Sequence, residues 1–207
     1  MRLRIRRLQL SARAHHWIVW SRYLLLVIGT VALGYVGMTL LESRLYQKSA
    51  KQSLEAQIQT IKTSDSLQTK VPVKVGDVLG RLDIPRLGIS VAILQGTSLR
   101  TLRLGAGHIE ATPLPGDSGN SGIAGHRDTF FRELRNVRTT DQIQLQTATG
   151  VLHYEVDWVK IVRPNDMTVL AASSDSALTL VTCYPFYFVG PASDRFVVHA
   201  RLSRPAL

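Results

Sequence analysis

Alternating hydrophobic and polar residues dominate the chain after residue 77 and predict a mainly β domain. Leu152, Tyr154 and Val156, for example, alternate with polar neighbours, which is the period of a strand with one buried face. Many short strands with brief helical insertions favour a closed β-barrel of about eight strands over a βαβ sheet. The predicted strands are Val78–Ile84, Ile89–Leu94, Ser121–Gly125, Gln142–Thr147, Val151–Val162, Ala177–Thr182 and Arg195–Leu202, and the predicted helical segments are Ser98–Leu104, Thr129–Val137 and Asp166–Leu170.

A continuous apolar segment near the N-terminus predicts one transmembrane helix. Residues 23–41 contain no charged side chain, and 19 apolar residues are long enough to cross a bilayer core. A cleaved signal peptide is the alternative, but its apolar region is usually shorter and no small-x-small cleavage pattern follows this one. We therefore expect an uncleaved single-pass anchor in the cytoplasmic membrane.

The charge distribution sets the expected orientation of this anchor. Residues 1–22 carry six arginines and no acid, and Glu42 is the first charged residue after the apolar segment. Positive flanks stay on the cytoplasmic side, so we expect the N-terminus inside and the later domain outside. The formal net charge of +10 falls to +4 without residues 1–22. Because the rest of the chain has no basic stripe interleaved with aromatics, we do not expect nucleic-acid binding.

The composition divides the chain into four expected parts. They are a basic cytoplasmic segment (1–22), the anchor (23–41), a stalk or linker (42–76) and the predicted β domain (77–207). The stalk is rich in Gln, Lys and Ser, with leucines and isoleucines at loose helical spacing. We interpret it as a helical or partly disordered spacer. A helix packed on the domain is the alternative, which its polar excess disfavours.

Cys183 is the only cysteine, and it stands at the end of a predicted strand. Tyr184 and Pro185 follow at once, and proline has no N–H for a sheet ladder. Most lone cysteines are small buried hydrophobes. Outside the cytoplasm, however, an unpaired thiol is a liability unless it is buried or used, so a reactive role is a serious alternative.

Among the histidines, His126 is the best candidate partner for this thiol. It follows a short apolar run flanked by glycines, which gives it the same placement at a strand end. His108 also follows a glycine and is second, although it could simply cap or pack. His153 and His199 occupy the polar phase of strands and are expected to be solvated, and Asp128 is expected to cap the helix that follows it.

Three motifs stand in a fixed order along the chain: Gly125-His126, then Thr-Leu-Val-Thr-Cys over residues 179–183, then Arg195 at the start of the following strand. They resemble the catalytic histidine, the TLxTC signature and the arginine of the sortases, which are membrane-anchored cysteine transpeptidases. The resemblance spans about residues 78–202. One departure is a threonine, Thr140, where glycine is expected before an aspartate in a turn. Class D is the most similar class, through Ala124–Phe131 and Cys183–Phe186, and the opening strands match through Leu82–Pro85, Leu87-Gly88 and Gly96-Thr97.

The resemblance implies a reaction and roles for these residues. An LPxTG-like sorting signal would be cut between threonine and glycine, held as a thioester on Cys183 and passed to an amine. His126 would be the general acid and base, and Arg195 would orient substrate and stabilise the oxyanion. A surface ion pair is the alternative role for Arg195. Met167, Val169 and Leu170 are candidate pocket residues, and Thr182 either contacts substrate or fills the strand.

The implied partners are secreted proteins with a C-terminal sorting signal, and an amine acceptor such as a cell-wall precursor or a pilin lysine. We expect no cofactor and no metal, because Glu133, Asp141, Asp166 and Asp175 are scattered. Two other functions stay open. One is a cysteine endopeptidase that uses water as acceptor, and the other is a non-catalytic envelope-binding domain.

Overall fold

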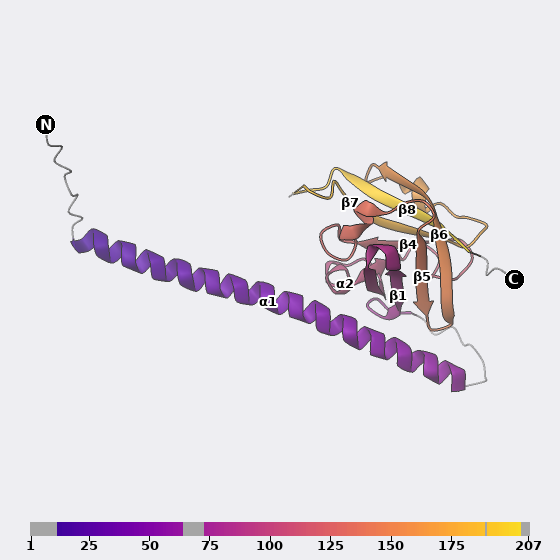
Figure 1. The fold of residues 1–207 in the computed structure, drawn as a ribbon, viewed down its shortest axis with the longest axis horizontal. Coiled ribbons are helices and arrows are strands. Elements are labelled where there is room, and N and C mark those ends of the chain that lie inside the picture. Colours follow the sequence, from indigo (N-terminus) through magenta and orange to yellow (C-terminus); the bar gives the residue numbers. More distant parts are fainter. Residues whose placement is uncertain (1–11, 64–72, 189, 204–207) are drawn as a thin grey trace. The chain divides into compact units, whose positions relative to one another are not determined.

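A closed β-barrel follows a long N-terminal helix in the computed structural model, which describes residues 12–63, 73–188 and 190–203 (Figure 1). The strands close in the order β1-β2-β3-β4-β7-β8-β6-β5, and β5 pairs with β1. The predicted mainly β barrel of eight strands is therefore confirmed. The strands are β1 (Val78–Ile84), β2 (Ile89–Gln95), β3 (Ala106–His108), β4 (Asn120–Gly125), β5 (Gln142–Thr147), β6 (Gly150–Val162), β7 (Ala177–Tyr184) and β8 (Asp194–Leu202).

Two parallel pairings, β2 with β3 and β4 with β7, interrupt an otherwise antiparallel barrel. Alternate residues of each strand point inward, and Leu178 and Leu180 of β7 are fully buried in the core. Thr179, Val181 and Cys183 consequently face the other side of the sheet. The helices are α1 (Ala12–Thr63) and α2 (Leu99–Leu104), with 3-10 turns η1 (Pro85–Leu87), η2 (Arg132–Asn136) and η3 (Met167–Leu170).

The predicted elements differ from the structure in three places. β3 was not predicted, because three residues are too few to show alternation. The helix predicted over Thr129–Val137 is reduced to η2. Asp128 does not cap it, because η2 begins after Phe131 and has no side-chain cap. By contrast, α2 forms as predicted, and Ser98 caps it by accepting a hydrogen bond from the Thr101 N–H.

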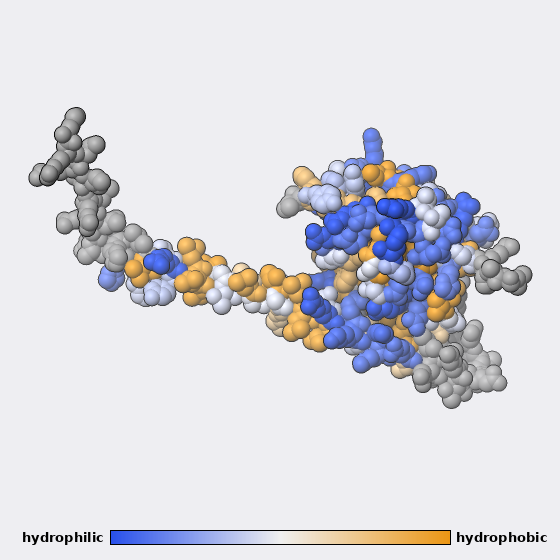
Figure 2. All heavy atoms as spheres, in the orientation of Figure 1, coloured by the Kyte–Doolittle hydropathy of each residue, from blue (hydrophilic) through white to orange (hydrophobic). Residues whose placement is uncertain are grey.

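The first half of α1 is long and apolar enough to span a membrane. The qualifying segment runs from Val19 to Ala56 with a mean hydropathy of 2.2 in its most apolar window. The leucines and valines between residues 24 and 45 are exposed, and Figure 2 shows apolar residues as orange spheres along the helix. Apolar side chains exposed in such a continuous run fit a lipid environment rather than water. The arginines before Ala12 lie outside the described residues.

The second half of α1 packs on the barrel, in contrast to the predicted free stalk. Ala50 and Leu54 are buried. The Gln47 side chain accepts a hydrogen bond from the Ala92 N–H and donates one to the Leu104 carbonyl. These three residues lie on one helical face at spacings of three and four. The overall polarity of the segment concealed this narrow face, which the sequence nevertheless contains.

Candidate active site

The parallel pair β4 and β7 brings His126 and Cys183 to the same edge of the barrel. Gly125, the last residue of β4, is in register with Thr182 of β7. His126 follows Gly125 directly and Cys183 follows Thr182, so both residues stand at the same end of these two neighbouring strands. Both side chains are half-buried. The two strand-end residues identified from the sequence are thus brought together by the fold.

Arg195 lies directly opposite Cys183 on the other side of β7. The two residues are register partners in the antiparallel pair of β7 and β8. Directly opposed residues share one face of the sheet and have Cβ atoms about 5 Å apart. The thiol therefore stands between a histidine on one neighbouring strand and an arginine on the other.

The guanidinium of Arg195 is hydrogen-bonded to the backbone rather than to a carboxylate in the described structure. Its Nη1 donates a hydrogen bond to the backbone carbonyl of Asp194, at 3.0 Å. The Asp194 carboxylate instead accepts from the Ser193 hydroxyl, at 2.8 Å. Within residues 73–188 and 190–203, no carboxylate forms an ion pair with Arg195. The surface ion pair considered from the sequence does not form.

Thr182 points away from the face that carries Cys183. Its exposed fraction is 2%, and its hydroxyl donates a hydrogen bond of 2.7 Å to the carbonyl of Gly125. This bond ties β7 to β4 immediately before the two functional side chains. The sequence leaves two roles open for Thr182, and the structure supports packing within the sheet rather than contact with substrate.

Gly125 permits the chain to pack closely beneath His126. A Cβ atom there would lie 2.5 Å from Cδ2 of the Phe131 ring, which is fully buried. The Phe131 N–H donates to the His126 carbonyl, at 3.1 Å. The turn after His126 is thus held against the core by Phe131, and this anchoring explains why the predicted helix cannot start at Thr129.

An apolar surface covers the first part of the outer face of β4, on the same side of the sheet as Cys183. A Cβ atom at Gly122 would lie 2.9 Å from Leu170 Cδ2 and 3.0 Å from Ile109 Cδ1. Leu170 and Ile109 therefore both lie over Gly122. Of the other pocket candidates in η3, Val169 is half-buried and Met167 is exposed. The sequence did not identify Ile109, which follows a strand that was itself too short to predict.

Arg127 is a further residue near the site that the sequence analysis missed. Its guanidinium donates to the carbonyls of Pro185 and Gly190, at 2.8 and 2.7 Å. It thereby connects the segment of His126 to the loop that follows Cys183. An arginine directly after the candidate histidine was the available signal, but its partners are distant in sequence.

His108 is a structural residue rather than a second catalytic candidate. Its exposed fraction is 1%, and burial lowers its pKa. Nε2 lies 2.9 Å from the Pro113 carbonyl, and Nδ1 lies 2.9 Å from Oε1 of Gln95. Because a neutral ring carries one N–H, it satisfies both contacts when the Gln95 amide is turned over, so that Nε2 donates to Pro113 and the Gln95 side-chain nitrogen donates to Nδ1. This bonding fixes the loop after β3.

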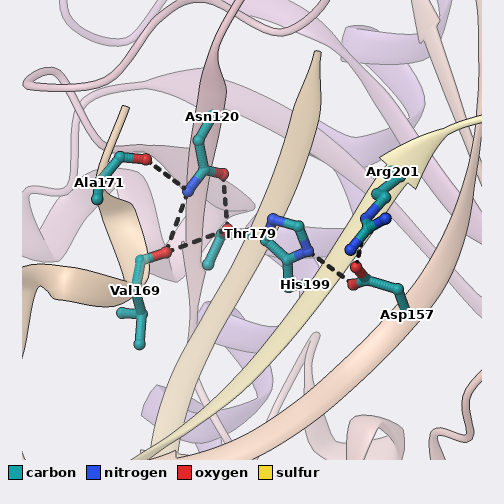
Figure 3. Close-up of polar contacts among 7 residues, drawn as sticks. All are labelled: Asn120, Asp157, Val169, Ala171, Thr179, His199 and Arg201. Atoms are coloured by element: carbon teal, nitrogen blue, oxygen red, sulfur yellow. Dashed lines mark hydrogen bonds and ion pairs between the residues drawn. The ribbon is translucent and has the colours of Figure 1, made fainter. Parts of the chain in front are cut away.

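His199 is not solvated as expected, because it belongs to a side-chain cluster between β6 and β8. Its Nδ1 is 2.7 Å from Asp157, its ring stacks on Trp158 at 4.8 Å, and Arg201 forms an ion pair with the same carboxylate (Figure 3). The register pairs His199 with Thr179 and Cys183 with Arg195. His199 therefore lies four residues along the strand from the partner of the thiol.

A polar hollow of about 510 Å³ lies between η1 and η2. Its charged lining residues are Arg86, Glu133, Arg135 and Arg138. Cys183, His126 and Arg195 do not line it. Among the described residues no group of three potential metal ligands comes together. The candidate site lies elsewhere, at the edge of the barrel where β4, β7 and β8 adjoin, with a thiol, an imidazole and a guanidinium.

Comparison with known proteins agrees with this arrangement. The sortase domain model matches residues 82–203. Sortase D of Bacillus subtilis (strain 168) is 30% identical over 188 residues, which cover 86% of this chain and 94% of that protein. A Clostridium perfringens sortase D5 transpeptidase structure has a TM-score of 0.64 at 27% identity and covers 79% of this chain and 99% of its own.

A second solved structure, the lid mutant of sortase A from Corynebacterium diphtheriae, has a TM-score of 0.60 at 26% identity. It covers 77% of this chain and 96% of its own. The match to the family model extends over more than half of the chain, and it includes all three candidate residues. The chain therefore belongs to the sortase family of cysteine transpeptidases, and it is similar to the class D members.

Proposed function

We propose that this protein cleaves an LPxTG-like sorting signal between threonine and glycine and transfers the acyl fragment to an amine. The observation that supports this most strongly is the flanking of Cys183 by Arg195 in direct register and by His126 at the adjoining strand end. A nucleophile, a proton donor and a fixed cation are the three groups that such an acyl transfer requires.

In the first half of the reaction, the Cys183 thiolate attacks the threonine carbonyl carbon of the sorting signal. The thiolate, rather than the thiol, is the nucleophile in such an attack. The tetrahedral intermediate collapses when the C–N bond to glycine breaks, and His126 as imidazolium protonates the departing amine. The products are a thioester on Cys183 and the released glycine-containing fragment.

In the second half, an incoming amine attacks the thioester carbonyl. His126, now neutral, accepts the proton that the amine loses. The C–S bond breaks, which regenerates the thiolate and leaves the acyl fragment joined to the acceptor by an amide. The imidazole ends in its starting protonation state, so no external acid or base is consumed.

Arg195 acts on the substrate oxygen in both halves. A guanidinium keeps its proton and offers a rigid set of N–H donors. Because no carboxylate neutralises Arg195 in the described structure, these donors are available to bind the substrate carbonyl and the negative charge that develops on it. We assign it substrate orientation and oxyanion stabilisation.

Residues of η3 form one wall of the peptide-binding surface in this proposal. Leu170 and Val169 supply apolar contacts for the leucine and proline of the signal, and exposed Met167 lies at the outer edge. The proposed partners are secreted proteins with a C-terminal sorting signal and an amine acceptor, either a cell-wall precursor or a pilin lysine. The N-terminus would lie in the cytoplasm and the barrel outside the membrane.

A peptide assay tests this function directly. The full chain in detergent is incubated with fluorogenic LPxTG-type peptides, with and without an amine acceptor, alongside Cys183→Ala. We expect cleavage only with Cys183, and a ligated product when the amine is present. The products are identified by mass spectrometry.

Other outcomes would point to the alternative functions. Cysteine-dependent cleavage that never yields a ligated product with any acceptor tried would favour an endopeptidase that uses water. No cleavage of any peptide, together with a Cys183 that resists alkylation in the folded protein, would favour a non-catalytic binding domain.

A further inference from the structure

A buried pair of polar side chains, Asn120 and Thr179, joins the sheet to η3. Asn120 begins β4, Thr179 lies in β7, and their exposed fractions are 3% and 0%. The Asn120 amide nitrogen donates to the carbonyls of Val169 and Ala171, at 3.1 and 3.4 Å (Figure 3). One side chain thus binds the main chain on both sides of Leu170.

Thr179 fixes the orientation of the Asn120 amide. Its hydroxyl donates a hydrogen bond of 2.7 Å to the Asn120 side-chain oxygen. With the amide turned over, the Asn120 oxygen would face the two carbonyl oxygens of η3, and two acceptors do not bond. The arrangement is therefore directional, and its burial in a low-dielectric environment makes each lost bond costly.

The other hydrogen bonds of η3 are local. Asp166 accepts from the N–H and hydroxyl of Thr168, and the Ala171 N–H donates to the Thr168 carbonyl. Within the described residues, the hydrogen bonds that join η3 to the sheet run to Asn120 and Thr179. Without them, the position of Leu170 above Gly122 would depend on apolar contact alone.

We propose that Asn120, oriented by Thr179, is a positioning residue that sets the apolar wall formed by η3 and thereby the affinity for the peptide. This inference rests on the proposed function for its substrate. Asn120 lies six residues before His126, which is about 20 Å along an extended strand. Its loss should therefore weaken peptide binding and leave the chemistry at Cys183 largely intact.

The experiment compares Asn120→Ala with Ser121→Ala in the full chain. Ser121 is the next residue of β4, and its buried hydroxyl has no hydrogen-bond partner, so its removal is a matched control. For Asn120→Ala we expect KM for the peptide to rise at least about threefold, with kcat within about twofold of wild type. The rate at which iodoacetamide alkylates Cys183 should not change, and Ser121→Ala should resemble wild type in all three measurements.

Amide hydrogen exchange provides a readout that does not depend on the peptide. Asn120→Ala should speed exchange in residues 166–172 and leave the core strands protected. If wild type cleaves no sorting peptide, the proposed function fails, and exchange alone then decides whether Asn120 positions η3. If Asn120→Ala fails to fold, Thr179→Val is measured in its place, because it removes the orienting hydroxyl. Thr179→Ser keeps the hydroxyl, so its KM and its exchange in residues 166–172 should be closer to wild type.

Two results would overturn the inference. One is an Asn120→Ala protein, or its Thr179→Val substitute, with wild-type KM and wild-type exchange in residues 166–172. The other is an equal fall in kcat and in the alkylation rate of Cys183, because that would show a general loss of structure rather than a displaced wall.

Discussion

At the scale of single residues, strand alternation decides what surrounds the thiol. Cys183 and Thr182 are adjacent in sequence, yet one faces Arg195 and the other donates to the Gly125 carbonyl inside the sheet. The register of β7 with β8, rather than proximity in sequence, makes Arg195 the partner of the thiol. A one-residue slip of that register would place Phe196 or Asp194 opposite Cys183 instead.

Thr140 offers a test at this scale. It has a φ of 73°, a left-handed conformation that is unfavourable for a β-branched residue. Glycine is the residue that the family resemblance predicts here, and the positive φ gives the physical reason. Replacing Thr140 by Gly should remove a strain of about 1–2 kcal/mol and lose part of it to the greater freedom of glycine when unfolded. We expect a net gain of about 1 kcal/mol in the free energy of unfolding, measured by urea titration.

Thr139→Gly is the control for this prediction, because Thr139 has no positive φ. It should be neutral or destabilise the protein by up to about 1 kcal/mol. A Thr140→Gly protein that is no more stable than wild type would show that the turn is not strained.

At the scale of elements, the sequence predicts strands well and short or irregular segments poorly. Long alternation located β6 and β8, whereas β3 and the turn that buries Phe131 left no periodic signal. Cys183, His126 and Arg195 were found because two stand at strand ends and all three match motifs. Asn120 and Arg127 were missed because their partners are carbonyls some 50 or more residues away.

His108 of β3 contacts Gln95 of β2 and the Pro113 carbonyl in the following loop. Its burial predicts that the stability of the protein depends on pH. Burial lowers its folded pKa below the ordinary value of 6.5. As the pH falls below 6.5, the unfolded chain takes up a proton that the folded protein resists, and the folded state loses stability. The stability that neutral His108 contributes is fully present above pH 6.5. It is lost as the pH falls from 6.5 through the folded pKa.

The measurement is urea unfolding at about pH 7.5 and about pH 5.5 for wild type and His108→Gln. Glutamine does not titrate, so the variant should lose less stability on acidification than wild type, whatever its stability at the higher pH. An equal loss in both proteins would mean that other groups cause the pH dependence.

At the scale of the whole molecule, one chain joins an apolar helix to a closed barrel that carries the candidate reactive residues. The helix was predicted from length and charge alone, and the structure contains a helix that could span a membrane. The packing of its second half is the alternative that the polar excess of the segment disfavours, because a face of three residues is hidden in that segment.

The single cysteine makes the proposed topology testable. A membrane-impermeant maleimide should label Cys183 in intact protoplasts to the same extent as in lysed ones, since the barrel is proposed to lie outside. Cys183→Ala should take up no label, because the chain has no other cysteine. Labelling of wild type only after lysis, with the thiol reactive in the purified protein, would contradict the proposed orientation.

The most direct test of the central claim is to trap the covalent intermediate. Full-length protein is mixed with an LPxTG-type peptide without amine, quenched in acid and measured by intact mass. We predict an added mass equal to the peptide fragment that ends in threonine, located on Cys183, discharged by an amine acceptor and absent in Cys183→Ala. Cleavage of the peptide without this adduct, or an adduct on another residue, would contradict acyl transfer through the thiol of Cys183.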